Sequence, residues 1–508
     1  MKNINKIVGT GLIIMMVSLM GCNKFSDINT NPDTTTQVSA SMLCTGVILN
    51  ITKFNGKDAK AYIAEDALSK YIGYANEGQM GEQYNLIGSG SFGPMTILPN
   101  IDQMLIYAKG SVMESSYQGV AKFAKAFMFY NLTMEMGDVP YSEASKGADG
   151  LYRPNYDSQK DIFKGILEDL KAADQYFASG TNFTGDPTPY NGNPAKWRRA
   201  ANAFALKVLM TLSKKEGDAD LNVKSRFAGI VTTNQLIANT NDFFGLIYSS
   251  QNKHPLSGTN DLFTSRTVIS SVVIDSLKKL NDRRMYYFAE PSSAQITAGK
   301  TPNDPDAYVG VDVSMDYAAM NANYSANKYS VLNKRYLTEE ACEPRMLMSY
   351  AEQQLIIAEA VEKGWVTGAA EDYYKDGVKS ALAAIMATKA SYAHGMAINQ
   401  NYIDNYFTGE AAFKTTKDEQ LNQIRMQRYL LNFMQDAESA YFEYRRTGYP
   451  VFPINSATSL NVNNPGGLPM RWMYPGSETN YNRDNLVKAL NVQYDGYDEI
   501  NKLMWLVK

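Results

Sequence analysis

The sequence predicts a mainly α-helical protein whose helices lie in antiparallel pairs, with long irregular loops and small β-hairpins between them. The pairing is clearest over residues 345–386, where two segments each place apolar side chains at spacings of three and four. Two helices joined by so few residues must lie antiparallel and bury their apolar stripes together. Such a pair needs similar neighbours to cover its outer face, which predicts a scaffold of tetratricopeptide-like units.

Local signals predict where the two helices of residues 345–386 begin and end. Pro344 suits the first turn of the first helix, and Gly364 suits a left-handed residue just past its end. Thr367 is a candidate cap for the second helix, whose first turn carries Glu371 and Asp372. The small residues that would let the two backbones approach closely are Ala351, Ala358, Gly377 and Ala381.

The first 39 residues predict an export signal followed by a tether. Lys2 and Lys6 precede the apolar run Ile7–Met20, which is too short to span a bilayer and is typical of a secretory signal. The run ends in LMGC, so we expect cleavage after residue 21 and diacylation of Cys22, which would anchor the protein stably. Residues 22–39 are polar and aperiodic, as in a flexible tether. Residues 40–508 would then form the folded body.

The same helical spacing recurs along the body. The remaining expected helices lie at about 41–51, 59–74, 116–136, 158–177, 193–212, 218–231, 268–280, 418–434, 436–446 and 482–490. Asn76–Asn100 is expected to be a loop; its GxGxxG (Gly88, Gly90 and Gly93) precedes prolines rather than a helix, so it predicts no nucleotide site. Residues 243–335 form a loop-rich subregion in which we expect small hairpins.

Composition excludes several functions. The net charge of −3 gives no electrostatic footprint for nucleic acid, and the two histidines stand too far apart in sequence for a histidine metal cluster. Three cysteines cannot build a disulfide framework. Asp304, Asp306 and Asp312 have oxygen-ligand spacing for calcium, but they match no fixed loop pattern and a solvated acidic turn is the commoner structure. We therefore predict no cofactor and no metal.

No residue pattern indicates catalysis. The chain lacks a GxSxG nucleophile elbow. The paired carboxylates Glu339 with Glu340 and Glu371 with Asp372 resemble glycosidase pairs only in type, because both are expected at helix starts, where capping explains them. The protein is therefore not expected to be an enzyme.

Sequence motifs along almost the whole chain carry a family resemblance. They are the lipoprotein signal at Cys22, NTNPD (29–33), GDVPYSEA (137–144), KWRRAANAFALKVLMTLSK (196–214), MSYAEQQLIIAEAVEKGW (348–365), YFEYRRTGYPVFP (441–453) and PMRWMYP (469–475). In combination they resemble the SusD/RagB-type nutrient-binding lipoproteins of the Bacteroidetes. Met470 stands where the family often has a second arginine, and the chain end LMWLVK also differs from the family's usual close.

The resemblance implies a non-catalytic, lipid-anchored binding protein on the outer membrane, facing the cell exterior. It also implies a SusC-like TonB-dependent barrel transporter as partner, on which the protein acts as a hinged lid that captures an oligosaccharide or oligopeptide. Two alternatives are an extracytoplasmic hydrolase on a helical scaffold and a helical-repeat scaffold for a partner protein. A neighbouring transporter gene would favour the lid.

The family's ligand residues vary between members, so a candidate ligand surface must come from the residues themselves. Helix pairs use their aromatic side chains for packing, so free aromatic faces are expected from the loops 76–100 and 281–336. Tyrosine rings and asparagine amides in such loops suit a sugar or an extended peptide. The predicted ligand-binding residues are Tyr84, Asn85, Phe92, Tyr308, Tyr324 and Tyr329.

Overall fold

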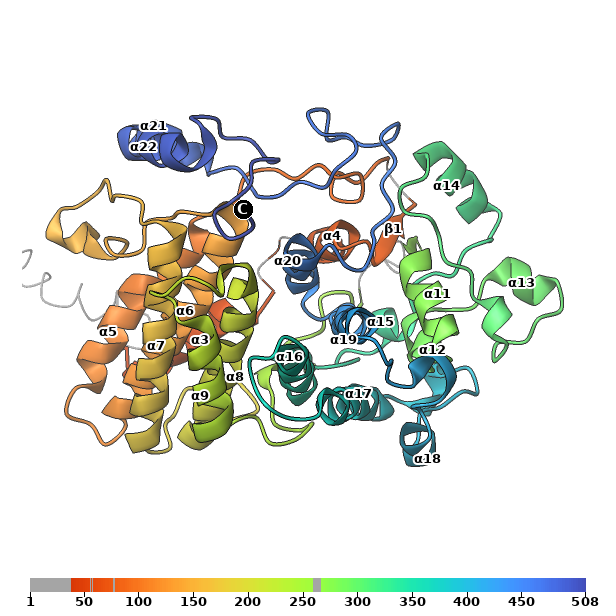
Figure 1. Cartoon of the computed structure of the whole chain (residues 1–508), viewed down its shortest axis with the longest axis horizontal. Coiled ribbons are helices and arrows are strands. Elements are labelled where there is room, and N and C mark those ends of the chain that lie inside the picture. The colour runs from red at the N-terminus through yellow and green to blue at the C-terminus, as the bar shows by residue number, and fades with distance from the viewer. Residues whose placement is uncertain (1–37, 55, 57, 76–77, 259–265) are drawn as a thin grey trace, which may run out of the picture.

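The computed structural model describes residues 38–54, 56, 58–75, 78–258 and 266–508 (Figure 1). Helices form most of the regular structure in these residues, and the strands make two small two-stranded sheets. The mainly α-helical prediction is therefore confirmed. The export signal, Cys22 and the tether up to residue 37 lie outside the described residues.

A bundle of long helices forms one half of the molecule (Figure 1). Helix α6 packs against α7 on one side and against α3 and α5 on the other, while α8 lies against α7 and α9 lies against α8. The bounds are α3 (Ala40–Thr52), α5 (Leu98–Ala108), α6 (Glu114–Met136), α7 (Gln159–Ser179), α8 (Pro194–Thr211) and α9 (Val223–Thr233).

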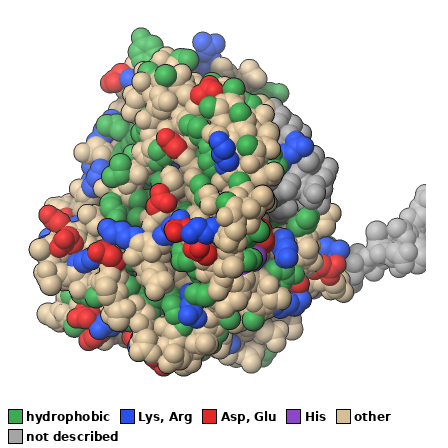
Figure 2. All heavy atoms as spheres, turned by 90° about the vertical axis from the view of Figure 1, so that its right-hand side faces the viewer, with side chains coloured by type: hydrophobic (Ala, Val, Ile, Leu, Met, Phe, Trp, Pro, Cys, Tyr) green, Lys and Arg blue, Asp and Glu red, His purple; other side chains and the backbone are tan. Residues whose placement is uncertain are grey.

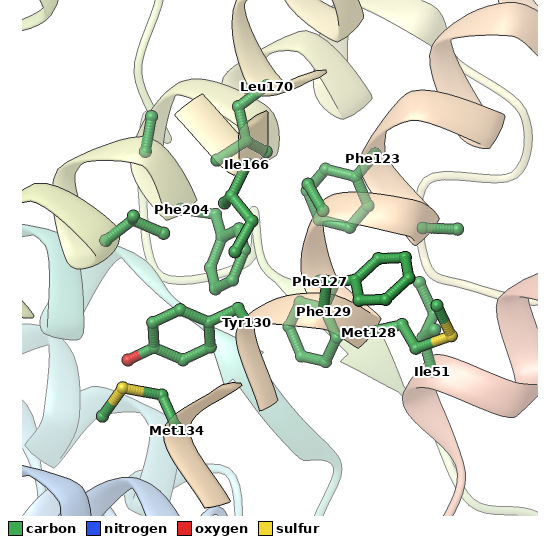
Figure 3. Close-up of a cluster of buried hydrophobic side chains, with 14 of the residues drawn as sticks. Ile51, Phe123, Phe127, Met128, Phe129, Tyr130, Met134, Ile166, Leu170 and Phe204 are labelled. Carbon is green, nitrogen blue, oxygen red and sulfur yellow. The ribbon is translucent and has the colours of Figure 1, made fainter. Parts of the chain in front are cut away.

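The core of this bundle is aromatic and aliphatic (Figure 3). The rings of Phe127 and Tyr130 from α6 lie 4.9 and 5.2 Å from Phe204 of α8, centroid to centroid. Ile166 and Leu170 of α7 are fully buried beside them. Ser158 caps α7 by accepting a hydrogen bond from the backbone N–H of Asp161. In α7 the buried residues recur at the helical spacing of three and four, whereas α6 and α8 are buried on nearly every side.

The helix pair predicted over residues 345–386 consists of α16 (Tyr350–Glu362) and α17 (Ala370–Met386), which pack against each other. Gly364 has a φ of +72°, as predicted for the residue after a helix end. At Gly377, a Cβ atom would lie 2.8 Å from the Leu355 side chain, so the two backbones approach as closely as the small residues indicated. Helix α16 also contacts α19 (Lys417–Leu431) and α8, and so joins the two halves of the molecule.

Two predictions about the ends of this pair are wrong. Residues 345–348 form strand β4 (Arg345–Met348), which pairs antiparallel with β2 (Phe244–Leu246), and the helix begins only at Tyr350. Ser349 caps α16 by accepting from the N–H of Glu352. Residue Ala369, rather than Thr367, precedes α17, and it makes no side-chain cap. Four residues are too few for their sequence pattern to distinguish a strand from the first turn of a helix.

The subregion 243–335 is more regular than predicted. Its strands pair with distant segments instead of forming hairpins, since β3 (Thr267–Ile269) pairs antiparallel with β1 (Ile72–Tyr74). The expected helix at 268–280 is confirmed only as α11 (Ser271–Lys279). The other helices here are α12 (Arg284–Phe288), α13 (Ser293–Thr297), η4 (Pro305–Ala307), α14 (Tyr317–Ser325) and α15 (Arg335–Thr338). Four of these are too short to show an apolar stripe, and α14, although as long as α11, buries only Met320, which explains why sequence periodicity missed them.

The remaining elements complete the fold. Helix α4 ends at residue 68 rather than 74, and the expected loop 76–100 contains a 3₁₀ turn and the start of α5. These elements are α4 (Ala59–Leu68), η1 (Gly93–Ile97), η2 (Lys146–Asp149), η3 (Leu212–Lys215), η5 (Ala390–Tyr392), α18 (Gln400–Asp404), η6 (Gly409–Ala411), α20 (Ala437–Thr447), α21 (Gly476–Tyr481) and α22 (Arg483–Tyr494). Met504 and Leu506 then return to the core of the first half.

Candidate functional site

The six predicted ligand-binding residues do not lie together, and three of them point inward. Tyr84 and Tyr308 are buried: their hydroxyl groups donate to the backbone oxygens of Met315 (3.0 Å) and Pro302 (2.9 Å). Tyr308 also packs edge-on against Tyr286, with centroids 5.1 Å apart. The expectation that these two rings offer free faces is wrong. Tyr308 packs in the core of the subregion 243–335, and Tyr84 is buried with its hydroxyl bound to that subregion.

Asn85 is also buried and has a structural role. Its φ of +67° places it in the left-handed region, and its side-chain oxygen accepts from the Lys70 ammonium at 2.7 Å. Lys70 also donates to the backbone oxygen of Gln83. Burial lowers the pKa of Lys70 to about 7. Asn85 therefore closes a turn over a buried lysine.

Phe92, Tyr324 and Tyr329 are half-buried and keep part of each ring at the surface. Tyr324 and Tyr329 pack on a small cluster around Val311, and the Asn323 amide donates to the Tyr329 hydroxyl at 3.1 Å. Phe92 lies elsewhere, beside Tyr156 at 6.4 Å between ring centroids. Tyr324 and Tyr329 thus form one potential contact surface, and Phe92 belongs to another.

A polar cavity of about 330 Å³ lies between the two halves of the molecule. The carboxylates of Glu65, Glu135 and Glu438 line it and make no hydrogen bond or ion pair with any residue that the structure describes, whereas Lys207 and Asp436 form an ion pair at 3.2 Å. Burial, then repulsion from Asp436, raises the pKa of Glu438 to about 7. Burial and repulsion from Glu438 raise the pKa values of Glu65 and Glu135 as well.

Two open hollows lie beside each other around α11, α18 and α19. One, of about 510 Å³, contains Lys279, Glu410 and Lys414, whose charges pair with each other at 3.0 to 3.6 Å. The other, of about 330 Å³, is lined by Leu280, Asn281, Arg283, Met396, Asn399, Asn401, Tyr402, Asn405, Tyr406 and Thr408. We call it the Arg283 hollow. Sequence reasoning missed it, although three asparagines around Tyr402 in residues 399–405 were a visible signal.

The side of the molecule that carries α13 and α14 has no large patch of one charge (Figure 2). Acidic and basic side chains lie there in small mixed groups among uncharged polar atoms. Asp304 and Asp306 belong to such a group, because both pair with Lys300, and Asp312 accepts from the hydroxyl of Ser314. The three aspartates therefore act in local turns, and no calcium cage is formed by the described residues.

The part of the chain that the structure describes brings no metal-binding constellation together. No three His, Cys, Asp or Glu side chains there converge as metal ligands. His254 is buried, and burial followed by repulsion from Arg335 and Arg345 lowers its pKa to about 3. Glu371 and Asp372 lie in the first turn of α17 as predicted, but Glu339 follows the end of α15, where it binds Lys389 and Tyr392. Among the described residues, no helix has the length and apolarity needed to cross a bilayer.

Comparison with known proteins identifies the family to which the chain belongs. Residues 32–475 match the SusD-like family model, which is described as starch-binding and associating with the outer membrane. The chain belongs to the SusD-like family. A SusD homologue of Bacteroides fragilis NCTC 9343 is 39% identical, with a TM-score of 0.88, over 93% of this chain and all of that one.

Other solved structures share the fold. An outer-membrane protein from Bacteroides vulgatus ATCC 8482, linked by its description to nutrient binding, is 32% identical with a TM-score of 0.83 over 93% of this chain and all of that one. A chitin-binding protein at 24% identity has a TM-score of 0.74 over 92% of this chain and all of its own length, which shows the fold alone. A search of the curated proteins finds no match.

Proposed function

We propose that this SusD-like protein captures a nutrient oligosaccharide, or an oligopeptide, at the cell surface and delivers it to a TonB-dependent barrel transporter. The single observation that carries the proposal is the family match over residues 32–475. The protein would act as the lid of the transporter and would be held at the outer membrane by acyl chains on Cys22. Its proposed work is binding without turnover, in line with the family model's description as starch-binding.

An exposed apolar surface supports a protein partner. Val462, Tyr481, Val492 and Tyr497 are each more than two-thirds exposed, and all lie in the C-terminal segment around α21 and α22. In Figure 1 this segment lies along the top edge of the molecule, above the helical bundle. Exposed apolar side chains gathered in one segment are typical of an interaction surface. We assign this surface to the transporter.

The function is tested by two measurements on the full-length protein. A panel of purified polysaccharides, oligosaccharides and oligopeptides is screened for binding, with mass spectrometry of the ligands after prolonged incubation. Affinity purification from membranes in mild detergent then tests for a co-purifying barrel protein. We expect binding without new products, together with recovery of the transporter. Reproducible cleavage would favour the hydrolase, and failure to bind any ligand would contradict the proposal.

Two variants and one control variant test the transporter surface and the lipid anchor separately. Val492→Glu on α22 should reduce recovery of the transporter, whereas Val112→Glu, at an equally exposed valine between α5 and α6, should not. Cys22→Ala should move the protein out of the outer-membrane fraction. Equal recovery with both valine variants would place the partner surface elsewhere, and unchanged membrane attachment of Cys22→Ala would contradict lipid anchoring.

A further inference from the structure

Arg283 is a half-buried arginine with no acidic partner, and it lies in an otherwise uncharged hollow. Every other residue that lines the Arg283 hollow is neutral. Among the described residues, no carboxylate oxygen comes within 4 Å of its guanidinium group, whereas the neighbouring Arg284 is bound by Asp282 at 2.6 to 3.1 Å. The hollow therefore carries one uncompensated positive charge. Its volume, about 330 Å³, falls within the range of small-molecule sites.

Tyr402 holds Arg283 in place. The guanidinium carbon lies 4.5 Å from the centre of the Tyr402 ring, and the Tyr402 hydroxyl accepts from the backbone N–H of Arg283 at 3.0 Å. One terminal nitrogen of Arg283 donates to the backbone oxygen of Ala397 at 2.8 Å. A guanidinium group has five N–H donors, so most of the planar fork stays available to a ligand. An arginine already fixed by stacking loses little freedom when it binds.

The acid next to Arg283 in sequence is not available to neutralise it. Asp282 is fully buried and accepts from Arg284 and also from the Tyr406 hydroxyl at 2.6 Å. Asp282 thus binds Arg284 and Tyr406 inside the protein, and it does not line the hollow. The charge of Arg283 remains directed to whatever occupies the hollow.

Four exposed asparagines surround this charge with amide groups. Asn399 uses its side-chain oxygen to cap α18 at the N–H of Tyr402, and Asn405 donates to the backbone oxygen of Asn401 at 2.8 Å. The amide NH₂ groups of Asn399 and Asn401 and the side-chain oxygen of Asn405 make no hydrogen bond with any described residue, and neither does the side chain of Asn281. The hollow therefore offers both donors and acceptors beside one cation, the combination that vicinal hydroxyls and one carboxylate require.

We propose that the Arg283 hollow binds a carboxylate-bearing sugar unit, a uronate, within an oligosaccharide. The inference rests on the proposed function and names the substrate class for one site. Arg283 pairs with the carboxylate through two parallel N–H groups, and the asparagines bind the ring hydroxyls. Leu280 lines both hollows, so the next sugar units extend over it toward the hollow of about 510 Å³.

The test compares matched acidic and neutral glycans by isothermal titration with the full-length protein. The acidic set contains oligomers of galacturonate, glucuronate and mannuronate, and the neutral set contains gluco-, galacto- and xylo-oligosaccharides of the same lengths. We expect an acidic oligomer to bind best, with affinity falling as salt rises. Arg283→Gln should weaken that binding at least tenfold. Lys300→Gln removes a similar charge outside the hollow and should leave binding unchanged.

The outcomes separate this inference from the proposed function. Binding of a neutral oligosaccharide with the same affinity in wild type and Arg283→Gln overturns the uronate site but supports a glycan-binding function. Binding of an acidic peptide through Arg283, with no acidic glycan bound, also overturns it. Failure of every glycan and peptide to bind contradicts both. Melting curves of Arg283→Gln confirm the fold, and Asn401→Ala, which keeps the arginine, should weaken the acidic oligomer severalfold.

Discussion

Glu359 on α16 and Arg446 on α20 form a buried two-point ion pair, with both N–O distances at 2.8 Å. Arg428 and Arg425 approach the same carboxylate at 3.4 and 3.3 Å. Glu443 completes the cluster by binding Arg428 and Arg446. Despite burial, the attraction of Arg446 and its neighbours holds the pKa of Glu359 well below its ordinary value. The cluster joins helix α16 to helices α19 and α20.

Glu359→Gln should therefore be strongly destabilising. Removing one partner of a buried ion pair typically lowers the free energy of unfolding by about 3–5 kcal/mol. Because the folded-state pKa is depressed, the carboxylate stabilises the fold above its ordinary pKa and loses this effect as pH falls through the lower folded-state value. Urea unfolding at pH 7 and at lower pH measures both effects. Glu371→Gln, at an exposed i,i+4 pair with Lys375, should change stability by less than about 0.5 kcal/mol.

Gly377 and Gly229 should respond oppositely to alanine. At Gly377 on α17 the new methyl group would lie 2.8 Å from Leu355, and such overpacking costs about 1–3 kcal/mol. At Gly229 on α9 a Cβ meets open space, so alanine should stabilise the helix by up to about 1 kcal/mol. Thermal melts of both variants measure the difference. Equal effects would contradict the close approach of α16 and α17.

Glu438 should make stability depend on pH in the opposite sense to Glu359. Its folded-state pKa is raised to about 7 by burial and by repulsion from Asp436, with Arg345 and Arg445 lowering it in part. The protonated form is thus favoured in the fold, and stability is lost as pH rises from about 4.5 through 7. Because one pKa unit corresponds to about 1.4 kcal/mol, Glu438→Gln should be about 3 kcal/mol more stable than wild type at pH 8, with the difference vanishing near pH 4.

A matched control isolates that effect. Glu168→Gln removes an exposed carboxylate that pairs with Arg226 at the surface of the first half, and it should leave the pH profile unchanged. Destabilisation by Glu438→Gln at pH 8 would show that the cavity carboxylates are compensated in the folded protein.

Long helices were predictable from sequence, but the position of the candidate site was not. Helix α7 buries a stripe whose spacing is visible in the residues themselves, whereas α6 is apolar enough to be buried on nearly every side. Strand β4 was missed because its identity depends on pairing with β2, a hundred residues earlier. The Arg283 hollow combines residues 280–283 with 396–408, and only tertiary folding brings them together. Tyrosine content in loops indicated a surface, yet the loops' own packing uses Tyr84 and Tyr308.

Variants of Tyr84 and Tyr324, two of the six predicted ligand-binding residues, should therefore distinguish a tyrosine that stabilises the fold from one that contacts a ligand. Tyr84→Phe keeps the buried ring but removes the hydrogen bond to the Met315 carbonyl, which should lower stability by about 1 kcal/mol without changing ligand affinity. Tyr324 is half-buried, so Tyr324→Ala should be well tolerated in melts. If the ligand contacts this surface, Tyr324→Ala should weaken binding about tenfold, as expected for the loss of an aromatic anchor. Unchanged affinity in Tyr324→Ala, alongside weakened affinity in Arg283→Gln, would show that the ligand binds at the Arg283 hollow and does not contact the α14 surface.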